Sequence, residues 1–270
     1  MNNDSPAKAL LVVLAVAFVC SILVSVASVT LKSVQLRNQL IEKNRNIISL
    51  TGLVAPGQAL SDEELLAAIE QLDIRVVDLD TGLFTTSVDP EKYDPRAARQ
   101  NPELSVAIPD ADDLARLGRR EKYAVVYLIW SEGLLQRLIL PVYGQGMWSM
   151  LYGYIALEAD LNTVAAMTFY EQTETAGLGD QLQSPAWLAN WSGRKIYGGR
   201  GDVRFRVASG AVGPGSLVAL HQVDGITGAT VTGDAVTHLI QYWFGPHGYG
   251  PLISEMQLQP LERLAAGSER

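Results

Sequence analysis

The hydrophobic residues of the chain follow two patterns, an unbroken apolar run near the N-terminus and periodic apolar positions after it. Residues 9–31 read ALLVVLAVAFVCSILVSVASVTL, a run without a charge between Lys8 and Lys32. About 20 apolar residues cross the hydrocarbon core of a bilayer as one helix. The pattern therefore predicts a transmembrane helix over 9–31, preceded by an N-terminal tail over 1–8.

A cleaved signal peptide is the alternative interpretation of this run, because Ser25-Val26-Ala27 has the small residues of a processing site. The anchor is favoured because the run is long for a signal peptide and continues without Gly or Pro into a helix-like polar stretch over 32–49. Basic residues lie on both flanks and place the C-terminal part weakly in the cytoplasm, which leaves the orientation open.

The segment after the anchor is expected to contain a juxtamembrane helix and a connector over 32–60, with breaks at Gly52 and Pro56-Gly57. Ser61 and Glu64 have the spacing of a capping box and predict the start of a helix. The apolar face of that helix is expected to carry Leu65, Leu66, Ile69 and Leu72. Residues 86–117 are polar and rich in proline, which predicts irregular structure with short helices.

Seven further segments have the pattern of strands and two have the pattern of helices. The strands are expected at 74–79, 123–130, 134–142, 147–157, 164–170, 203–207 and 216–223, and the helices at 186–191 and 233–244. Ser131-Glu132-Gly133 predicts a hairpin between the second and third of these strands. The predicted fold class is α+β, a mostly antiparallel sheet with packed helices over residues 61–270.

The composition of the chain argues against several classes of partner, disulfide and metal site. The net charge of -8 argues against a nucleic-acid partner, which usually meets a basic patch. A single cysteine, Cys20, excludes an intramolecular disulfide and a multi-cysteine zinc or iron–sulfur site. The three histidines, His221, His238 and His247, have no zinc-binding spacing, so structural or surface roles and no metal site are expected.

Residues 224–232, which read DGITGATVT, form the most informative segment. Taken alone, they predict a turn of small residues that opens a helix. Such a helix start offers free N–H groups for a phosphate, Gly228 and Ala229 permit close approach, and the threonines supply hydroxyls. On periodicity alone, simple threonine capping of the helix is the favoured interpretation.

The same residues resemble the motif D-x-x-[S/T]-G-A-T of the covalent FMN-binding domain family, found in subunits of bacterial respiratory complexes. In that family the last threonine carries FMN through a phosphoester, so the resemblance implies Thr230 as the acceptor. It also implies that Asp224 belongs to the sequence that a dedicated flavin transferase reads, and that Asp224, Thr227, Gly228 and Ala229 are cofactor-binding residues. The other interpretation of Asp224 is a turn former that bonds nearby backbone N–H groups, and the two roles are compatible.

The resemblance extends along most of the chain. Residues 174–179, ETAGLG, are similar to the family's E-T-P-G-L-G loop, with Ala176 in place of proline, which should loosen the turn. Residues 146–150, GMWSM, are similar to its G-x-W-S segment. Residues 243–245 and 248–251, WFG and GYGP, are similar to the family's C-terminal W-x-G…G-[F/Y]-G-P ending, and the start Asn2-Asn3-Asp4-Ser5 with the single anchor fits one member of the family best.

These motifs imply a set of flavin contacts. Leu178 is expected to pack on the flavin ring, and Thr175 is expected to offer a hydrogen bond. The Glu174 carboxylate is expected to place a charge near the flavin and to tune its potential. Trp148 is expected either to wall the flavin pocket or to be a core aromatic residue on a strand.

Within the family, the chain resembles the C subunits of Na+-translocating NADH:quinone reductases. The resemblance implies an electron-relay subunit of a six-subunit complex, which receives electrons from an iron–sulfur centre and passes them to the FMN of the B subunit. The implied partners are the B, D and E membrane subunits, and a flavin transferase acts during maturation. The implied location is the bacterial inner membrane, with the domain on the periplasmic side and no catalytic acid or base.

Two alternatives remain open from the sequence. One is the equivalent flavoprotein subunit of the related Rnf complex, which would share the covalent FMN. The other, from a different class, is a membrane-tethered periplasmic scaffold or binding protein in which Thr230 is unmodified.

Overall fold

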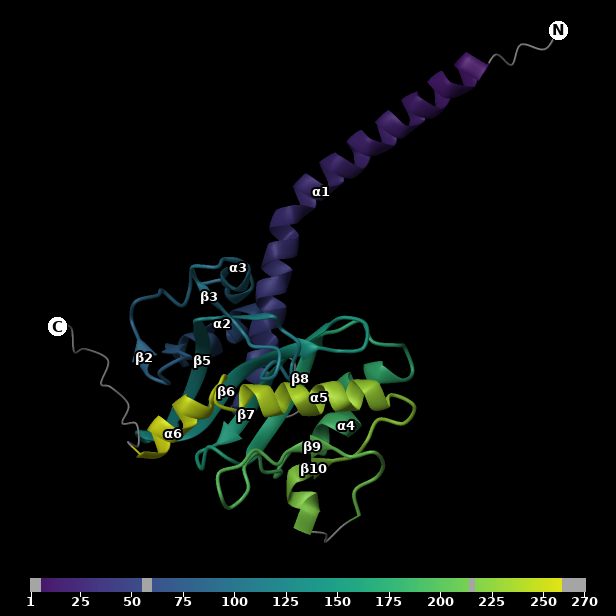
Figure 1. The fold of residues 1–270 in the computed structure, drawn as a ribbon. Helices are drawn as coiled ribbons and strands as arrows, with labels where there is room; N and C mark the ends of the chain where they lie inside the picture. Colours follow the sequence, from purple (N-terminus) through teal and green to yellow (C-terminus); the bar gives the residue numbers. More distant parts are fainter. Residues whose placement is uncertain (1–5, 55–59, 214–216, 259–270) are drawn as a thin grey trace. The chain divides into compact units, whose positions relative to one another are not determined.

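A computed structural model describes residues 6–54, 60–213 and 217–258 of the chain (Figure 1). The chain divides into two compact units, Met1–Arg45 and Asn46–Arg270. The start Asn2-Asn3-Asp4-Ser5 and the expected break at Pro56-Gly57 lie outside the described residues.

The first unit is helical. Helix α1 spans Pro6–Thr51, and its apolar part, Lys8–Lys32, has a mean hydropathy of 3.0 with no buried residue. The helix passes through Ser25-Val26-Ala27 without a break. This length and composition are consistent with a single-pass membrane anchor.

The end of α1 belongs to the second unit. Ile47, Ile48 and Leu50 are buried, and the Arg137 guanidinium donates to the Leu50 carbonyl at 2.8 Å. Gly52 follows the helix with φ +73°, the left-handed conformation that commonly ends a helix. The helix therefore stops where the sequence predicts, but the compact unit begins at Asn46 rather than in the region of Ser61.

The centre of the second unit is an antiparallel sheet with the strand order β2-β1-β5-β6-β7-β8 (Figure 1). The strands are β1 Asp73–Asp78, β2 Phe84–Thr85, β5 Tyr123–Ser131, β6 Leu134–Gln145, β7 Met150–Glu158 and β8 Val164–Glu171. Glu132 and Gly133 form the predicted hairpin turn between β5 and β6, and both have positive φ, as in the turns that match strand twist. The sheet confirms the predicted α+β class.

Shorter elements surround this sheet. They are α2 Asp62–Glu70, α3 Pro95–Gln100, β3 Ser105–Ala107, β4 Arg119–Glu121, the 3-10 helix η1 Gly179–Gln183, α4 Pro185–Ala189, β9 Arg206–Val207, the 3-10 helix η2 Leu217–His221, β10 Gln222–Val223, α5 Thr230–Trp243 and α6 Gly250–Leu258. The capping box of α2 is present in both directions, since Ser61 Oγ accepts from Glu64 N and Glu64 Oε2 accepts from Ser61 N. Strands β9 and β10 pair in parallel, whereas β3 and β4 pair antiparallel.

Helix α5 contacts β6, and its buried side chains join the core cluster of the sheet (Figure 1). Trp243, near the end of α5, is almost fully buried and donates its indole N–H to the Tyr143 carbonyl at 2.6 Å. Its ring stacks on Tyr249 with a centroid distance of 5.1 Å. These contacts fix the helix against the sheet and thereby fix the position of its first residue, Thr230.

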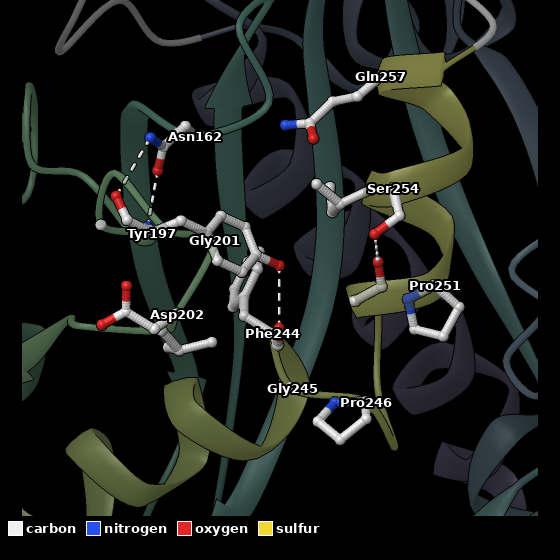
Figure 2. Close-up of a pocket in the computed structure, with 14 residues that line it drawn as sticks. Asn162, Tyr197, Gly201, Asp202, Phe244, Gly245, Pro246, Pro251, Ser254 and Gln257 are labelled. Carbon is white, nitrogen blue, oxygen red and sulfur yellow. Dashed lines mark hydrogen bonds between the residues drawn. The ribbon is translucent and has the colours of Figure 1, made fainter.

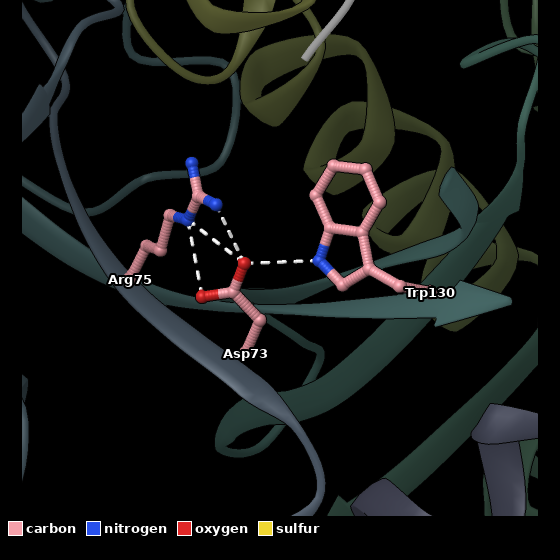
Figure 3. Close-up of polar contacts among 3 residues, drawn as sticks. All are labelled: Asp73, Arg75 and Trp130. Atoms are coloured by element: carbon pink, nitrogen blue, oxygen red, sulfur yellow. Dashed lines mark hydrogen bonds and ion pairs between the residues drawn. The ribbon is translucent and has the colours of Figure 1, made fainter. Parts of the chain in front are cut away.

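A polar cluster joins strands β1 and β5 near the edge of the sheet (Figure 3). The Arg75 guanidinium pairs with the Asp73 carboxylate at 2.6 Å, and the Trp130 indole N–H donates to the same carboxylate at 2.9 Å. The Arg75 guanidinium also lies 5.1 Å from the centre of the Phe84 ring on β2. The cluster thus links three neighbouring strands.

Several predicted elements differ from the structure. The strand expected at 147–157 starts only at Met150, because the three residues before it form a turn. The strand expected at 216–223 is wrong: Ser216 lies outside the described residues, and the rest is η2 followed by the two residues of β10. The strand expected at 203–207 is reduced to β9. Leu66 of α2 is exposed rather than part of the buried face.

Glu121 on β4 is a buried carboxylic acid, and only 3% of it is exposed. The Tyr143 hydroxyl donates to its Oε2. Burial raises the pKa of Glu121 to about 6, and the Tyr143 hydrogen bond and the charges of Arg120 and Arg99 offset only part of that effect. The folded protein therefore holds a proton at Glu121 at pH values where the unfolded chain has lost it.

The free energy of unfolding should accordingly fall as the pH rises from about 4.5 to about 6. Glu121→Gln removes this titration and keeps an oxygen that can accept from Tyr143. The stability of the variant relative to the parent should therefore increase by about 2 kcal/mol across that pH range, measured by urea unfolding. Glu103→Gln, at an exposed glutamate, is the matched control, and parallel pH profiles for Glu121→Gln and the parent would contradict the prediction.

Candidate functional site

Three segments that are distant in sequence meet at the start of α5. They are the turn 146–149 between β6 and β7, the loop 174–179 after β8, and the turn 224–229 that leads into the helix. Hydrogen bonds to one carboxylate, that of Glu174, connect the first two segments to the helix. The structure therefore brings most of the residues that the sequence singled out into one place.

The turn before α5 is closed by a hydrogen bond from Ala229 N to the Ile226 carbonyl at 3.0 Å. Gly228 has φ +76°, a conformation that side chains rarely adopt. A Cβ at Gly228 would also lie 2.9 Å from Cδ2 of Leu178, so the glycine lets the loop approach. The turn thus requires glycine at position 228 because of the positive φ and because Leu178 approaches so closely.

Thr230 is the first residue of α5 and is exposed. The N-cap residue is Ala229, which makes no side-chain cap, so the simple threonine-capping interpretation is wrong. Among the described residues, the Thr230 hydroxyl has no hydrogen-bond partner. The first N–H groups of a helix have no partner within the helix and carry a partial positive charge, which suits an anion such as phosphate.

The loop after β8 is a tight turn around Gly177, which has φ +76°. The Thr175 carbonyl accepts from Leu178 N at 3.1 Å and from Asp180 N at 3.3 Å. These two hydrogen bonds close the turn although Ala176 stands where the family motif has proline. Leu178 remains 41% exposed beside Gly228, and Thr175 is exposed as well.

Trp148 lies on the turn between β6 and β7 and is 64% exposed, so the interpretation as a core aromatic residue is wrong. Its indole N–H donates to the Thr175 hydroxyl at 3.0 Å, which joins the turn to the loop. Large apolar side chains are exposed around the start of α5, namely Met147, Trp148, Leu178 and Val231. Together with Thr230 they form a surface that combines apolar groups, a threonine hydroxyl and a helix start.

Asp224 is tied into the protein rather than directed at Thr230. Its carboxylate accepts from Val212 N at 2.7 Å, and its carbonyl accepts from the Trp187 indole at 2.8 Å. A Cβ at Gly225 would lie 2.4 Å from the Ala208 carbonyl oxygen, so the turn is pressed against that segment. The Asp224 carboxylate therefore bonds a backbone N–H 12 residues away, which fastens the turn to the segment before η2 rather than closing the turn itself. Thr227 is exposed in the same turn.

The sequence did not identify the contact of Thr232 with Glu174. The Thr232 side chain is buried, and its hydroxyl donates to Glu174 Oε2 at 2.5 Å. Glu174 Oε1 accepts from Trp148 N at 3.0 Å. Both carboxylate oxygens therefore accept a hydrogen bond, one from the turn before β7 and one from α5. No local sequence pattern indicates this pairing, because the two residues are 58 positions apart.

A separate pocket of about 700 Å³ lies at the other end of α5 (Figure 2). Its lining includes Tyr197, Asp202, Phe244 and Ser254, and none of the site residues predicted from the sequence. Since α5 has 14 residues, its two ends are about 20 Å apart. The Tyr197 hydroxyl donates to the Phe244 carbonyl, so part of the polar lining is already paired within the pocket.

Comparison with known proteins assigns the domain. An FMN-binding domain family model matches residues 146–245, the region that contains all three segments of the site. The chain is 43% identical over 257 residues to the C subunit of the Na(+)-translocating NADH-quinone reductase of Pseudomonas aeruginosa, covering 95% of this chain and 98% of that one. It is 40% identical over 256 residues to the protein of the same name from Vibrio alginolyticus, covering 95% and 97%.

Solved structures agree with this similarity. The crystal structure of Shewanella oneidensis NqrC superposes with a TM-score of 0.72 at 32% identity, covering 81% of this chain and 97% of that chain. The C subunit of the Na(+)-translocating NADH-quinone reductase from Parabacteroides distasonis has a TM-score of 0.61 at 24% identity, covering 83% and 97%, and supports the fold alone.

Proposed function

Because the chain belongs to the family of the C subunits of Na(+)-translocating NADH-quinone reductases, oxidoreductase subunits with an FMN-binding domain, we propose that it carries FMN covalently on Thr230. The proposed linkage is a phosphoester to the threonine hydroxyl. The observation that carries the proposal is that Thr230 is the first residue of α5, at the helix start that Glu174 joins to the Trp148 turn and that Leu178 approaches at Gly228. The Thr230 hydroxyl is exposed and has no partner among the described residues.

The residues at this surface fit an FMN group. The free N–H groups at the start of α5 would hold the phosphate, and the exposed Gly228 carries no side chain that would cover the backbone there, whereas Ala229 is buried. The exposed side chains of Trp148 and Leu178 would contact the ring. The Thr175 hydroxyl accepts from Trp148, and its own proton is available for a further hydrogen bond.

Covalently bound FMN would give the subunit one- and two-electron redox chemistry. The chain's own contribution would be to retain the group and to leave it at the protein surface, where other carriers can approach. A surface site of this kind suits a relay better than an enzyme that encloses a substrate. The residues around Thr230 would hold and orient the group, and Glu174 is buried with a hydrogen-bond donor on each oxygen, an arrangement that suits a structural role.

We place the protein between an iron–sulfur centre and the FMN of the B subunit in a six-subunit complex. The B, D and E membrane subunits would be its closest partners, and NADH and quinone would bind elsewhere. A flavin transferase would attach FMN to Thr230 during maturation, reading the motif that runs from Asp224 to Thr230. The similarity of the chain to the C subunits of these reductases supports this arrangement.

The location follows from the same proposal. The Lys8–Lys32 span would anchor the protein in the bacterial inner membrane, with the domain on the periplasmic side. Flanking Lys and Arg favour the opposite orientation, but that bias has little weight for a large translocated domain. Protease added to intact spheroplasts should digest the domain. A domain that resists until detergent is added would contradict the periplasmic placement.

The direct test of the proposal is ultraviolet fluorescence of the denatured full-length protein on a gel. A covalent flavin survives denaturation, so protein from cells that also express the transferase should give a fluorescent band. A dark band would contradict the proposal and support the membrane-tethered scaffold or binding protein. A fluorescent band that co-purifies with Rnf partners would instead support the equivalent Rnf subunit.

A further inference from the structure

The buried carboxylate of Glu174 connects three parts of the site. Oε1 accepts from the backbone N–H of Trp148 at 3.0 Å, and Oε2 accepts from the Thr232 hydroxyl at 2.5 Å. Glu174 itself belongs to the loop that presents Thr175 and Leu178. We call Glu174, the Trp148 N–H and the Thr232 hydroxyl the carboxylate clamp.

The clamp is shielded from water. Glu174 is 7% exposed and Thr232 is 1% exposed, whereas Trp148 and Leu178 on the same segments are largely open to solvent. Hydrogen bonds to a carboxylate are stronger than those between neutral groups, and burial makes the loss of a partner more costly. The clamp is therefore a rigid base under a set of exposed side chains.

Two glycines leave the space in which the clamp forms. A Cβ at Gly146 would lie 2.7 Å from Glu174 Oε1, and a Cβ at Gly179 would lie 2.9 Å from the Thr232 hydroxyl oxygen. Both glycines have backbone conformations that other residues adopt, since neither has positive φ. Close approach therefore accounts for glycine at these two positions: to the clamp residues at Gly179, and at Gly146 to Glu174 together with Leu151 and the Ser149 carbonyl, the latter two each 2.9 Å from the added Cβ.

We propose that Glu174 is a positioning residue that fixes Thr230 relative to Trp148 and Leu178, and thereby sets how firmly an attached flavin is held. The inference rests on the proposed function of Thr230. Thr232 lies two residues after Thr230 in the same helical turn, so fixing one fixes the other. Glu174 acts through these neighbours and needs no contact with the flavin.

A carboxylate suits this position better than an amide. Glu174 accepts from two donors with two oxygens, whereas glutamine has one acceptor oxygen and one NH2 group. In Glu174→Gln the NH2 group would face either the Trp148 N–H or the Thr232 hydroxyl. The hydroxyl can rotate to accept from it, so this variant should fold with a weakened clamp.

The experiment compares full-length variants that are expressed together with a flavin transferase. The variants are Thr232→Val, Thr232→Ser, Glu174→Gln and the double variant Glu174→Gln/Thr232→Val. The readouts are gel fluorescence for attachment, visible circular dichroism and midpoint potential for the flavin environment, and thermal unfolding for the fold. Asp234→Asn is the matched control, because it removes an exposed acidic group near the start of α5 without touching the clamp.

Thr232→Val should keep the fluorescent band but lose most of the flavin circular dichroism, and its midpoint potential should shift. Glu174→Gln should show a smaller loss. Thr232→Ser keeps the hydroxyl and should restore the parent signal, and Asp234→Asn should match the parent. The double variant should lose no more than Thr232→Val alone, because both changes break one interaction.

The proposal is overturned if Thr232→Val keeps the parent's circular dichroism and potential, if Thr232→Ser behaves like Thr232→Val, or if the losses of the two single variants add. If Thr232→Val does not fold, the comparison of Glu174→Gln, Thr232→Ser and Asp234→Asn decides by the same criteria. If Thr232→Val folds but carries no flavin, peptide mapping of the parent protein decides. Flavin on Thr230 in the parent supports the clamp, whereas flavin on Thr232 overturns it. A dark parent band refutes the proposed function itself, so the two failures are distinct.

Discussion

Thr230→Ala is expected to remove the covalent flavin completely while leaving the domain folded. Thr230 is exposed at the start of α5, and its hydroxyl holds no other described residue. Substitutions at such surface positions usually change stability by no more than about 0.5 kcal/mol. Alanine cannot form the phosphoester, so the loss should be total. Gel fluorescence and the intact mass of the protein measure it.

Thr232→Ala is the matched control for the acceptor. It removes a hydroxyl two residues further along the same helix, and the fluorescent band should remain. A reversed result, with a dark Thr232→Ala band and a bright Thr230→Ala band, would show that the acceptor is assigned wrongly. A bright band in both variants would place the flavin on another residue.

Trp243→Ala should produce the largest loss of stability among the substitutions considered, about 3–5 kcal/mol. The side chain is almost fully buried between Tyr143 and Tyr249, and its indole N–H holds the Tyr143 carbonyl. Alanine would leave a cavity and a backbone acceptor without its donor. The melting temperature should fall by about 10 °C in a domain of this size.

Trp148→Ala is the control for this substitution, because the same residue type is 64% exposed at the site. It should change the free energy of unfolding by less than about 1 kcal/mol. Urea unfolding of both variants measures the difference. Comparable losses for the two tryptophans would contradict the view that Trp243 is a core residue and Trp148 a surface residue.

The sequence predicts the long elements of this fold well. Strands β5 and β6 and their hairpin turn at Glu132-Gly133 follow from apolar runs bounded by a turn, and α2 follows from its capping box. It does not predict the short strands β3 and β4, and it expects strands at 203–207 and 216–223 that are far longer than β9 and β10. Their two or three residues form strands only because partners from distant parts of the chain align beside them.

The candidate site also has features that the sequence predicts and features that it does not. The turn before α5 could be predicted from the motif, because its small residues and glycines are local in sequence, and the same motif carries the proposed acceptor, Thr230. The boundary of α5 could not, and the helix begins three residues before the predicted Gly233. Likewise, the exposure of Trp148 depends on the turn after β6, and the partner of Thr232 depends on how the loop after β8 folds back.

The burial of Ile47, Ile48 and Leu50 has a consequence for how the domain can be separated from its anchor. A fragment that starts at Ser61 would lack these side chains and leave their packing partners bare. Such bare apolar surface promotes self-association. A soluble fragment that starts at Asn46 retains the last turn of α1 and the Leu50 carbonyl that holds Arg137. The compact unit that contains the sheet thus includes the last part of a helix that the sequence presents as a juxtamembrane segment.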